Sequence, residues 1–360
     1  MTDSSKVSVL KTSPESVVRD YGKLMRMVDY EKYLPKNRTT IIKLNLSWSL
    51  YYPACSTEPW QLEGVLKTLR DDGYRDVVAM ENKTVVTDPL KGLEENGWRG
   101  VLDKYDVEFV PLTDVEWVEY EPQAETPGIE KTFPEGHYIP RPFFDTNVIH
   151  LPTIKTHGHT TMTGAIKNAF GGLITERRHH AHRYIHEVLV DLLKIQKEIH
   201  TGMFAVTDGT VAGNGRGPRT MEPVIKDLIL ASADQVAIDS TSARLMGFDP
   251  LEIDKLRLAN EQRLGEAHEE NIRILGEDIS EKDWGFEVGE SLVIRGDKLF
   301  RKGPLSFLEP LLFHTPLFKL PILGSAVYHD YLWYPTVGRA QIRKFMETKW
   351  GKKFKHYLSQ

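Results

Sequence analysis

The chain has 360 residues, of which 40% are hydrophobic and 27% are charged. This composition excludes a globally disordered protein, because enough apolar surface is available to offset the entropy lost when the chain orders. The formal net charge of -5 excludes a general electrostatic attraction to nucleic acid, so we expect no nucleic-acid partner.

Cys55 is the only cysteine. A single thiol excludes an intrachain disulfide and any iron–sulfur or multi-thiolate zinc site made by this chain alone. The first residues lack the basic-then-apolar pattern of a signal peptide, and no uncharged apolar run of about 18 residues occurs. We therefore expect a cytoplasmic protein without a transmembrane span.

Short β-branched runs alternate with helical patterns through the first two thirds of the chain, which favours parallel βαβ units. The predicted strands are Thr40–Leu46, Asp76–Met80, Val107–Val110, Asn147–Leu151, Phe204–Thr207 and Asp227–Leu230. Apolar stripes at helical spacing predict helices over 59–72 and 183–200. The stretch Glu119–Arg141 is rich in Pro, Glu and Gly, and it is predicted to be a surface excursion.

The first candidate ligands lie between the first predicted strand and the first predicted helix. Lys43 and Asn45 face the same side of the strand, and Ser56 and Thr57 precede a helix whose amides can hold an anion. Helix capping is the alternative explanation for the two hydroxyls. Cys55 is not favoured as a nucleophile, because no base is identifiable beside it.

The densest polar motif, residues 155–172, follows the strand Asn147–Leu151, where open α/β sheets bind ligands. Small residues there let the backbone approach a ligand, and lysines supply charge for phosphate or carboxylate. The predicted cofactor-binding residues of this motif are Lys155, Thr163 and Asn168. We predict His157 and Lys167 as catalytic residues. The alternative is a Gly/Thr-rich loop with two solvated lysines.

Six of the 13 histidines lie between His157 and His186. On a helix, His182 and His186 share one face a turn apart, which suits a metal if a third ligand comes from another loop. Nickel or zinc would fit imidazole ligands. The predicted metal ligands are His157, His182, His186 and Asp208, and His182 is also a catalytic candidate. The alternative is the basic start of a helix.

A third motif, residues 207–219, follows the strand Phe204–Thr207. Its glycines, Gly215 among them, allow backbone N–H groups to converge on an oxyanion, while Arg216 and Arg219 grip it. It is neither a P-loop nor a dinucleotide fingerprint. Capping of the turn is the alternative for Asp208. Further along, Asp234 is predicted to cap a helix, and Asp239 is a secondary candidate.

The expected fold is α/β, with mostly parallel Rossmann-like sheet layers flanked by helices. Residues 1–150 are predicted to form an N-terminal α/β lobe, and residues 151–300 a second α/β lobe that carries the His/Lys and Gly/Arg motifs. Residues 301–360 are predicted to form a C-terminal helical arm, apolar and interrupted by prolines. Aromatic and basic residues at its end can dock on a membrane surface; packing on its own domain or in a homodimer is the alternative.

Several motifs, in their order along the chain, resemble the family named domain of unknown function 362. They are Lys43-Leu-Asn45, Ser56-Thr57-x-Pro59, Lys155-Thr-His157, Thr163-Gly-x-x-Lys167-Asn168-x-x-Gly171, Asp208-Gly209, Gly215-x-Gly217-Pro218 and Asp234-x-x-Ala237-x-Asp239. The resemblance spans about residues 39–276 and leaves the arm uncovered. Several relatives carry a ferredoxin-like cysteine cluster that this chain lacks, so we expect no iron–sulfur cluster.

A more distant similarity is to the nickel-pincer lactate racemase family. It implies that Lys167 contacts a cofactor and that His157 and His182 ligate metal or move protons. The leading functional prediction is an enzyme that binds a small anionic molecule or a phosphorylated cofactor, with or without a divalent metal. The alternative is a non-catalytic membrane-surface or partner-binding protein that acts through the C-terminal arm.

Overall fold

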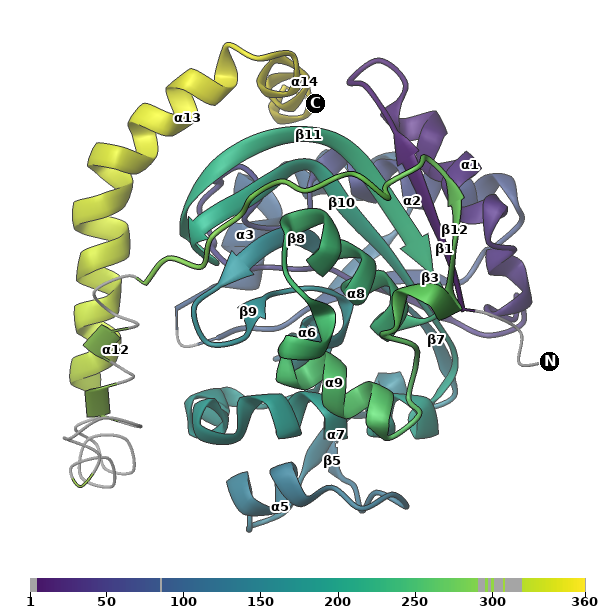
Figure 1. The fold of residues 1–360 in the computed structure, drawn as a ribbon, viewed down its shortest axis with the longest axis vertical. Helices are drawn as coiled ribbons and strands as arrows, with labels where there is room; N and C mark the ends of the chain where they lie inside the picture. The colour runs from purple at the N-terminus through teal and green to yellow at the C-terminus, as the bar shows by residue number, and fades with distance from the viewer. Residues whose placement is uncertain are drawn as a thin grey trace.

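A computed structural model describes residues 5–84, 86–290, 295–296, 299–300, 307 and 319–359, with the side chains of 176–179 and 319–322 left out. Within these residues, one large, mostly parallel sheet has helices on both faces (Figure 1). The predicted α/β fold class is therefore confirmed.

The strands of the large sheet are β1 (Ser5–Lys11), β2 (Thr40–Lys43), β3 (Val77–Glu81), β4 (Glu108–Pro111), β7 (Thr146–His150), β8 (Thr153–His157), β9 (Thr161–Met162), β10 (His200–Arg216), β11 (Thr220–Ser232) and β12 (Ile272–Gly276). Their order is β12–β1–β11–β10–β7–β2–β3–β4, with β8 beside β10 and β9 beside β8. The pairs from β10 through β7, β2 and β3 to β4 are parallel, whereas β11 runs antiparallel to both β10 and β1.

The helices are α1 (Val17–Met27), α2 (Pro59–Asp71), α3 (Pro89–Glu95), α4 (Trp98–Lys104), α5 (Pro127–Thr132), α6 (Ala165–Leu173), α7 (Ile185–Ile199), α8 (Gln235–Met246) and α9 (Asp254–Glu261). Short 3-10 segments lie at Tyr30–Lys32, Arg141–Phe143, Glu176–Tyr184, Pro250–Glu252 and Glu269–Asn271. Neighbouring strand residues point to opposite faces, so Ile41 packs into one core and Ile42 into the other. Helices α1, α2 and α4 cover the Ile42 face, and α6 to α9 cover the Ile41 face.

The sheet unites strands from both predicted lobes. β7, the last strand before residue 150, and β8, the first after it, both run parallel to β10. They follow one another along the same edge of β10, because β7 pairs with its first residues and β8 pairs from Asp208 onward. The predicted boundary near residue 150 therefore runs through the sheet.

The glycine- and arginine-bearing motif differs in local structure from the predicted loop. Residues 207–216 continue β10, which forms a long curved hairpin with β11 (Figure 1). Antiparallel pairing satisfies their backbone groups, so this stretch does not form a separate anion-binding turn. The predicted surface excursion Glu119–Arg141 contains α5 and β6 (Tyr138–Pro140), and β6 pairs with β5 (Trp117–Glu119), which ends where the excursion begins.

The predicted C-terminal arm is helical. It consists of α12 (Lys319–Ala326), a π-helix (Val327–Gly338), α13 (Arg339–Met346) and α14 (Lys349–Leu358). Figure 1 shows it standing along one side of the molecule and returning to the sheet at α14. Most of the proline-interrupted apolar stretch, residues 303–318, lies outside the described residues. Among the helices that the structure describes, none has the length and apolar character needed to cross a membrane.

Candidate anion-binding site

The end of β8 gathers the histidines of two predicted motifs. The backbone N–H of His159 donates to Nδ1 of His157 at 3.2 Å, which leaves the proton of a neutral His157 ring on Nε2. The His159 ring stacks on His182, with centroids 4.8 Å apart. His186 also lies beside His159, with its Nε2 3.3 Å from the carbonyl oxygen of His159. Sequence motifs separated by about 25 residues thus meet here.

His157 is surrounded mainly by basic groups. Burial holds the pKa of this imidazole well below its ordinary value, and the nearby Lys167, His159, His182 and Lys255 lower it further. We call these five residues the histidine–lysine cluster. Like charges in a buried place disfavour protonation, so His157 is neutral, and an anion placed here would relieve the repulsion among its neighbours.

The amino end of α6, which carries Lys167, is already occupied by a carboxylate of the protein. Asp239 Oδ1 accepts from the backbone N–H of Ala165 at 2.6 Å, and Oδ2 accepts from that of Ile166 at 3.1 Å. Burial raises the pKa of Asp239 to about 6, and Lys255, whose Nζ lies 3.9 Å away, opposes that rise. Asp239 therefore caps the helix, and a ligand anion has no access to these amides.

Lys155 lies two residues before His157 on β8, so both side chains point to the same face of the strand. Its buried ammonium donates to Asn45 Oδ1 at 2.9 Å and to Thr153 Oγ1. Burial lowers the pKa of Lys155 to about 8, and Cys55 and Glu58 oppose the change. The predicted partners Lys155 and Asn45 are thus brought together.

Arg219 lies near the same place, beneath the C-terminal arm. Burial raises the pKa of the Cys55 thiol to about 12. The positive charges of Lys155 and Arg219 oppose this rise. The guanidinium donates to Ser325 Oγ at 3.4 Å, and its buried Nη1 has no hydrogen-bond partner. Asp330 of the arm also attracts Arg219, and it accepts from Trp48 Nε1 at 2.7 Å. The arm therefore covers this predicted anion ligand.

Lys43 forms a buried ion pair at the carboxyl ends of β2 and β3. Its Nζ lies 2.8 and 2.9 Å from the two carboxylate oxygens of Glu81. The amide of Asn168 donates to the carbonyl oxygen of Lys43 at 3.0 Å. A Cβ on Gly171 would lie only 3.2 Å from Nζ, so the glycine makes room for the pair. These contacts give Lys43 and Asn168 structural partners.

The predicted hydroxyl ligands mostly tie backbone segments together. Thr57 Oγ1 donates to the Leu151 carbonyl and accepts from the Asn45 N–H, each at 2.8 Å. Thr163 Oγ1 donates to the Thr153 carbonyl at 3.1 Å. Ser56 makes only long contacts of 3.4 Å, and the capping box of α2 is formed by Glu58 and Gln61 instead.

Arg216 and Gly215 lie at the end of the β10–β11 hairpin. Arg216 is exposed there, and Gly215 accepts from Thr156 Oγ1 at 2.9 Å through its carbonyl oxygen. Among the described residues, the charge of Lys167 acts on His157, and Arg216 is not among the groups that do so. Arg216 therefore stands apart from the histidine–lysine cluster.

Comparison with known proteins agrees with the family resemblance. The model of the family described as Domain of unknown function (DUF362) matches residues 40–244. The chain belongs to this family. A thylakoid-associated protein of Synechocystis sp. is 32% identical over 127 residues, which cover 33% of this chain and 37% of that protein. The match thus spans little more than a third of the relative's length.

No solved structure matches this DUF362 chain. The similarity to the nickel-pincer lactate racemase family finds no support in the family match, so that part of the resemblance stays a prediction. The matched segment of the family model holds β2 to β11 and most of α8, and it therefore includes His157, Lys167, Lys155 and Lys43.

Within the described residues, the predicted metal ligands do not form a metal site. Asp208 lies in the core, where Tyr21, Trp60 and Thr210 donate four hydrogen bonds to its carboxylate. In the part of the chain that the structure describes, no group of three or more His, Cys, Asp and Glu side chains is arranged to hold a metal ion. Asp208 therefore has a structural role, and its bond from the Thr210 N–H agrees with the turn-capping alternative.

Two residues of the cluster were missed by reading the sequence. His159 lies in the predicted motif, two residues after His157, and that spacing was a usable signal. Lys255 comes from α9, almost a hundred residues later, and its Nζ donates to the carbonyl oxygens of Met162 and Thr163. No local pattern connects it with β8, so only the fold places it there.

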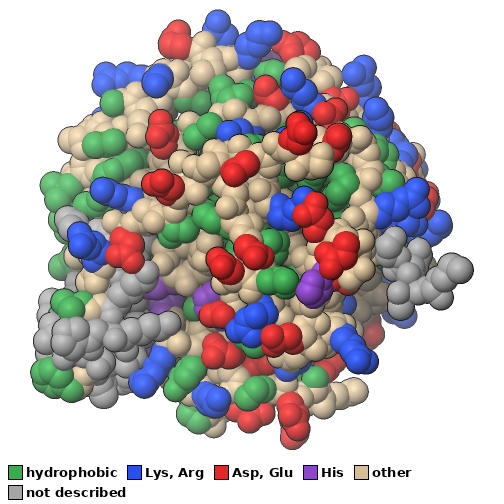
Figure 2. All heavy atoms as spheres, viewed as in Figure 1, with side chains coloured by type: hydrophobic (Ala, Val, Ile, Leu, Met, Phe, Trp, Pro, Cys, Tyr) green, Lys and Arg blue, Asp and Glu red, His purple; other side chains and the backbone are tan. Residues whose placement is uncertain are grey.

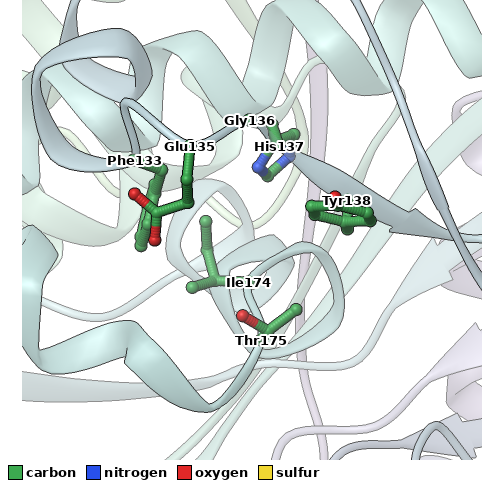
Figure 3. A pocket seen from close by; sticks show the side chains of 7 residues that line it. All are labelled: Phe133, Glu135, Gly136, His137, Tyr138, Ile174 and Thr175. Carbon is green, nitrogen blue, oxygen red and sulfur yellow. The ribbon is translucent and has the colours of Figure 1, made fainter.

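A pocket of about 290 Å³ opens beyond the carboxyl end of α6 (Figure 3). Its lining residues are Phe133, Glu135, Gly136, His137, Tyr138, Ile174 and Thr175. Burial lowers the pKa of His137 to about 4, and its Nε2 is buried without a hydrogen-bond partner. The pocket offers a neutral imidazole and lies directly after the helix that carries Lys167.

Proposed function

We propose that this protein is an enzyme that binds a small anionic molecule or a phosphorylated cofactor at the histidine–lysine cluster. One observation supports the proposal most strongly: the groups whose charges act on the buried His157 are basic, and they come from the turn after β8, from α6, from α9 and from the segment between α6 and α7. A protein gains little stability by placing basic groups around a buried imidazole, so we interpret the cluster as a place for an anion.

The chemistry that fits this cluster is acid–base catalysis on the bound anion. His157 accepts the His159 N–H at Nδ1, so its Nε2–H can donate to an oxygen of the ligand. Lys167 of α6 is half-buried, and its charge complements a carboxylate or phosphate. An isomerase- or racemase-like proton transfer is the reaction class that we favour: His182 takes the proton from a substrate carbon and returns it, while the Nε2–H of His157 stabilises the negative charge that forms on the substrate oxygen.

Anion binding is tested by thermal unfolding of the full chain with oxalate, a small dicarboxylate that has neither the phosphates nor the base of a nucleotide. A ligand that binds only the folded state at about 100 times its Kd adds about 2.7 kcal/mol of stability, so the unfolding temperature should rise. His157→Gln and Lys167→Met should remove most of that rise. The control His268→Gln changes a more exposed histidine outside the cluster and should keep it.

Equal stabilisation of the wild type and both cluster variants would contradict anion binding at this place. Proton transfer is tested separately, by incubating the protein in D₂O with a set of 2-hydroxy acids and following deuterium incorporation by NMR. We expect incorporation in the wild type and its loss in His157→Gln. Incorporation at equal rates in both would remove His157 from the chemistry.

We propose membrane-surface binding through the arm as the second function, because the arm exposes several large apolar side chains. Leu323, Tyr331, Leu332 and Val337 are all exposed, with Tyr331 at 75%. Residues 319–359 also carry eight Lys and Arg against two acidic side chains, in a chain whose net charge is -5. Figure 2 shows hydrophobic side chains gathered along this side of the molecule. The relative from Synechocystis is described as thylakoid-associated.

Vesicle co-sedimentation tests the second function. Apolar side chains beside basic ones bind anionic bilayers by inserting at the headgroup level while Lys and Arg meet the lipid charges. The double variant Tyr331→Ser/Leu332→Ser should therefore lose binding to vesicles that contain phosphatidylglycerol. Leu90→Ser is the matched control, because Leu90 is 54% exposed on α3, outside the arm. Identical sedimentation of the two variants would exclude the arm as the membrane contact.

A further inference from the structure

A second and larger pocket lies at the opposite edge of the sheet from the histidine–lysine cluster. Its volume is about 640 Å³, within the range of small-molecule sites. It is bordered by the start of β10 at His200–Met203, the end of β11 and start of α8 at Ser232–Gln235, and the start of β1 at Ser5–Lys6. β10 begins here, whereas the cluster lies at the carboxyl end of β8. We call this cavity the basal pocket.

The charged side chains that line the basal pocket are mostly basic. Among the described residues, its cationic lining side chains are Lys6, Lys32, Lys197 and Arg263, which come from four separate segments. Lys32 is paired with Asp29 at 3.0 Å. The acidic lining residue, Asp234, accepts hydrogen bonds from Ser5 Oγ and from three backbone N–H groups. Its charge is therefore already engaged, and the basal pocket favours an anion.

A buried donor in the lining lacks a partner. Gln235 is only 2% exposed, and its amide Nε2 has no hydrogen-bond partner. Nδ1 of His200, another lining residue, is also buried without a partner. An unsatisfied buried polar group typically costs about 1–3 kcal/mol. An acceptor oxygen bound in the basal pocket would satisfy the Gln235 amide, which makes this donor an observation independent of the surface charges.

The rim of the basal pocket is held in a strained conformation. Arg263 has a φ of 57°, in the left-handed region that costs a non-glycine residue about 1 kcal/mol or more. The loop packs closely against the start of α8, where a Cβ on Gly265 would collide with the Asp234 carboxylate. On the other side, a Cβ on Gly202 would collide with the carbonyl oxygen of Tyr33. This close packing holds the backbone near Arg263 and Tyr33 at the rim of the basal pocket.

We propose that the basal pocket binds a nucleotide. Lys6, Lys197 and Arg263 hold its phosphates, and Gln235 donates to an acceptor oxygen or ring nitrogen. Tyr33 is 41% exposed and lines the pocket, so its ring stacks on the base. This site is separate from the cluster of the proposed function, and it gives the protein a second ligand or a regulatory nucleotide at the other end of the sheet.

The experiment is calorimetric titration of the full chain with ADP and, separately, with inorganic pyrophosphate. The wild type should bind both. Lys197→Gln/Arg263→Gln changes two exposed side chains that do not support the core, and it should weaken ADP binding at least 10-fold. Tyr33→Ala should weaken ADP binding but leave pyrophosphate binding nearly unchanged, because only the base stacks on the ring.

Two controls separate this site from other sources of binding. Lys91→Gln removes an exposed lysine on α3 and should leave both affinities unchanged. His157→Gln should also leave ADP binding unchanged, so failure of the basal pocket is distinguishable from failure of the histidine–lysine cluster. The proposal is overturned if the wild type does not bind ADP, or if Lys197→Gln/Arg263→Gln binds it as tightly as the wild type. A Tyr33→Ala loss that is equal for both probes would overturn the nucleotide assignment.

Discussion

At the residue scale, the buried ionisable groups were the hardest to interpret from sequence. Lys43 and Lys155 have the residue type and position of anion ligands, yet the fold gives each an internal partner, Glu81 and Asn45. A buried ammonium is stable only when its charge is compensated, so these partners are needed whether or not a ligand binds. The buried histidines need no such partner, because burial keeps their imidazole rings neutral.

The buried Lys43–Glu81 pair leads to the first prediction at this scale. Lys43→Met alone should lower the free energy of unfolding by about 3–5 kcal/mol, because it leaves the Glu81 carboxylate buried without its partner. The double variant Lys43→Met/Glu81→Leu should recover much of that loss. Urea denaturation measures both; a double variant no more stable than the single one would show that the pair has another role.

His150 gives a pH-dependent prediction. Burial lowers its pKa from 6.5 to about 4, and Lys43 lowers it further. Between these values the unfolded chain holds a proton that the folded chain does not, so stability is lost as the pH falls from about 6.5 to about 4. His150 alone accounts for up to about 3 kcal/mol of this loss.

The measurement is urea denaturation at pH 7 and pH 4.5. His150→Gln should show a smaller loss of stability between the two pH values than the wild type. His268→Gln, in which a more exposed side chain is changed, should lose as much as the wild type. If all three proteins lose the same amount, His150 does not contribute to acid unfolding.

At the scale of elements, the turn between β9 and α6 determines whether the predicted ligand motif forms an open anion-binding loop. Gly164 has a φ of 115°, and the start of α6 after it is bonded to Asp239. The predicted motif residues therefore do not form an open loop around an anion. Instead, Asp239 of α8 fixes the start of α6, and Lys255 of α9 donates to β9, so His157 and Lys167 are held on a packed frame.

Gly164→Ala tests this frame. A methyl group there would collide with the Asp239 carboxylate and would also have to adopt a left-handed conformation, so we expect a loss of about 3 kcal/mol or more. Gly73→Ala is the matched control: its φ is 89°, and a Cβ there has open space around it. That variant should lose only about 1 kcal/mol in chemical denaturation. Equal losses would mean that backbone conformation, not Asp239, makes Gly164 necessary.

At the scale of the whole molecule, the two ends of the C-terminal arm differ. Near its end, Trp350, Phe354 and Tyr357 are buried in the core that also holds α1 and α2. The middle of the arm exposes Tyr331 and Leu332. The arm thus packs on its own domain at α14 while presenting an apolar surface elsewhere, so the two predicted alternatives for the arm involve different residues.

Trp350→Ala should lower the free energy of unfolding by about 3–5 kcal/mol, because it removes a buried indole and its 2.7 Å hydrogen bond to Asp227. Leu358→Ala, in the same helix at a residue that is 53% exposed, should change it by less than about 0.5 kcal/mol. Thermal and urea unfolding report both. A small effect of Trp350→Ala would show that α14 is not part of the cooperative unit.

The sequence by itself determined the α/β class, the family and the approximate positions of several strands and of the long helices α2 and α7. These depend on local periodicity and on ordered motifs, which a single chain displays directly. The extension of β10 through the glycine motif was missed, because isolated glycines favour turns until an antiparallel neighbour pairs their backbone groups.

Only the tertiary structure decided which polar residues are available for a ligand. Asp208, Asp239 and Lys43 look like ligands in sequence, but residues distant along the chain donate to them or pair with them in the core. Lys255 joined the histidine–lysine cluster from a distant helix for the same reason. A side chain's partners are set by long-range packing, and packing between distant segments leaves no local pattern in the sequence.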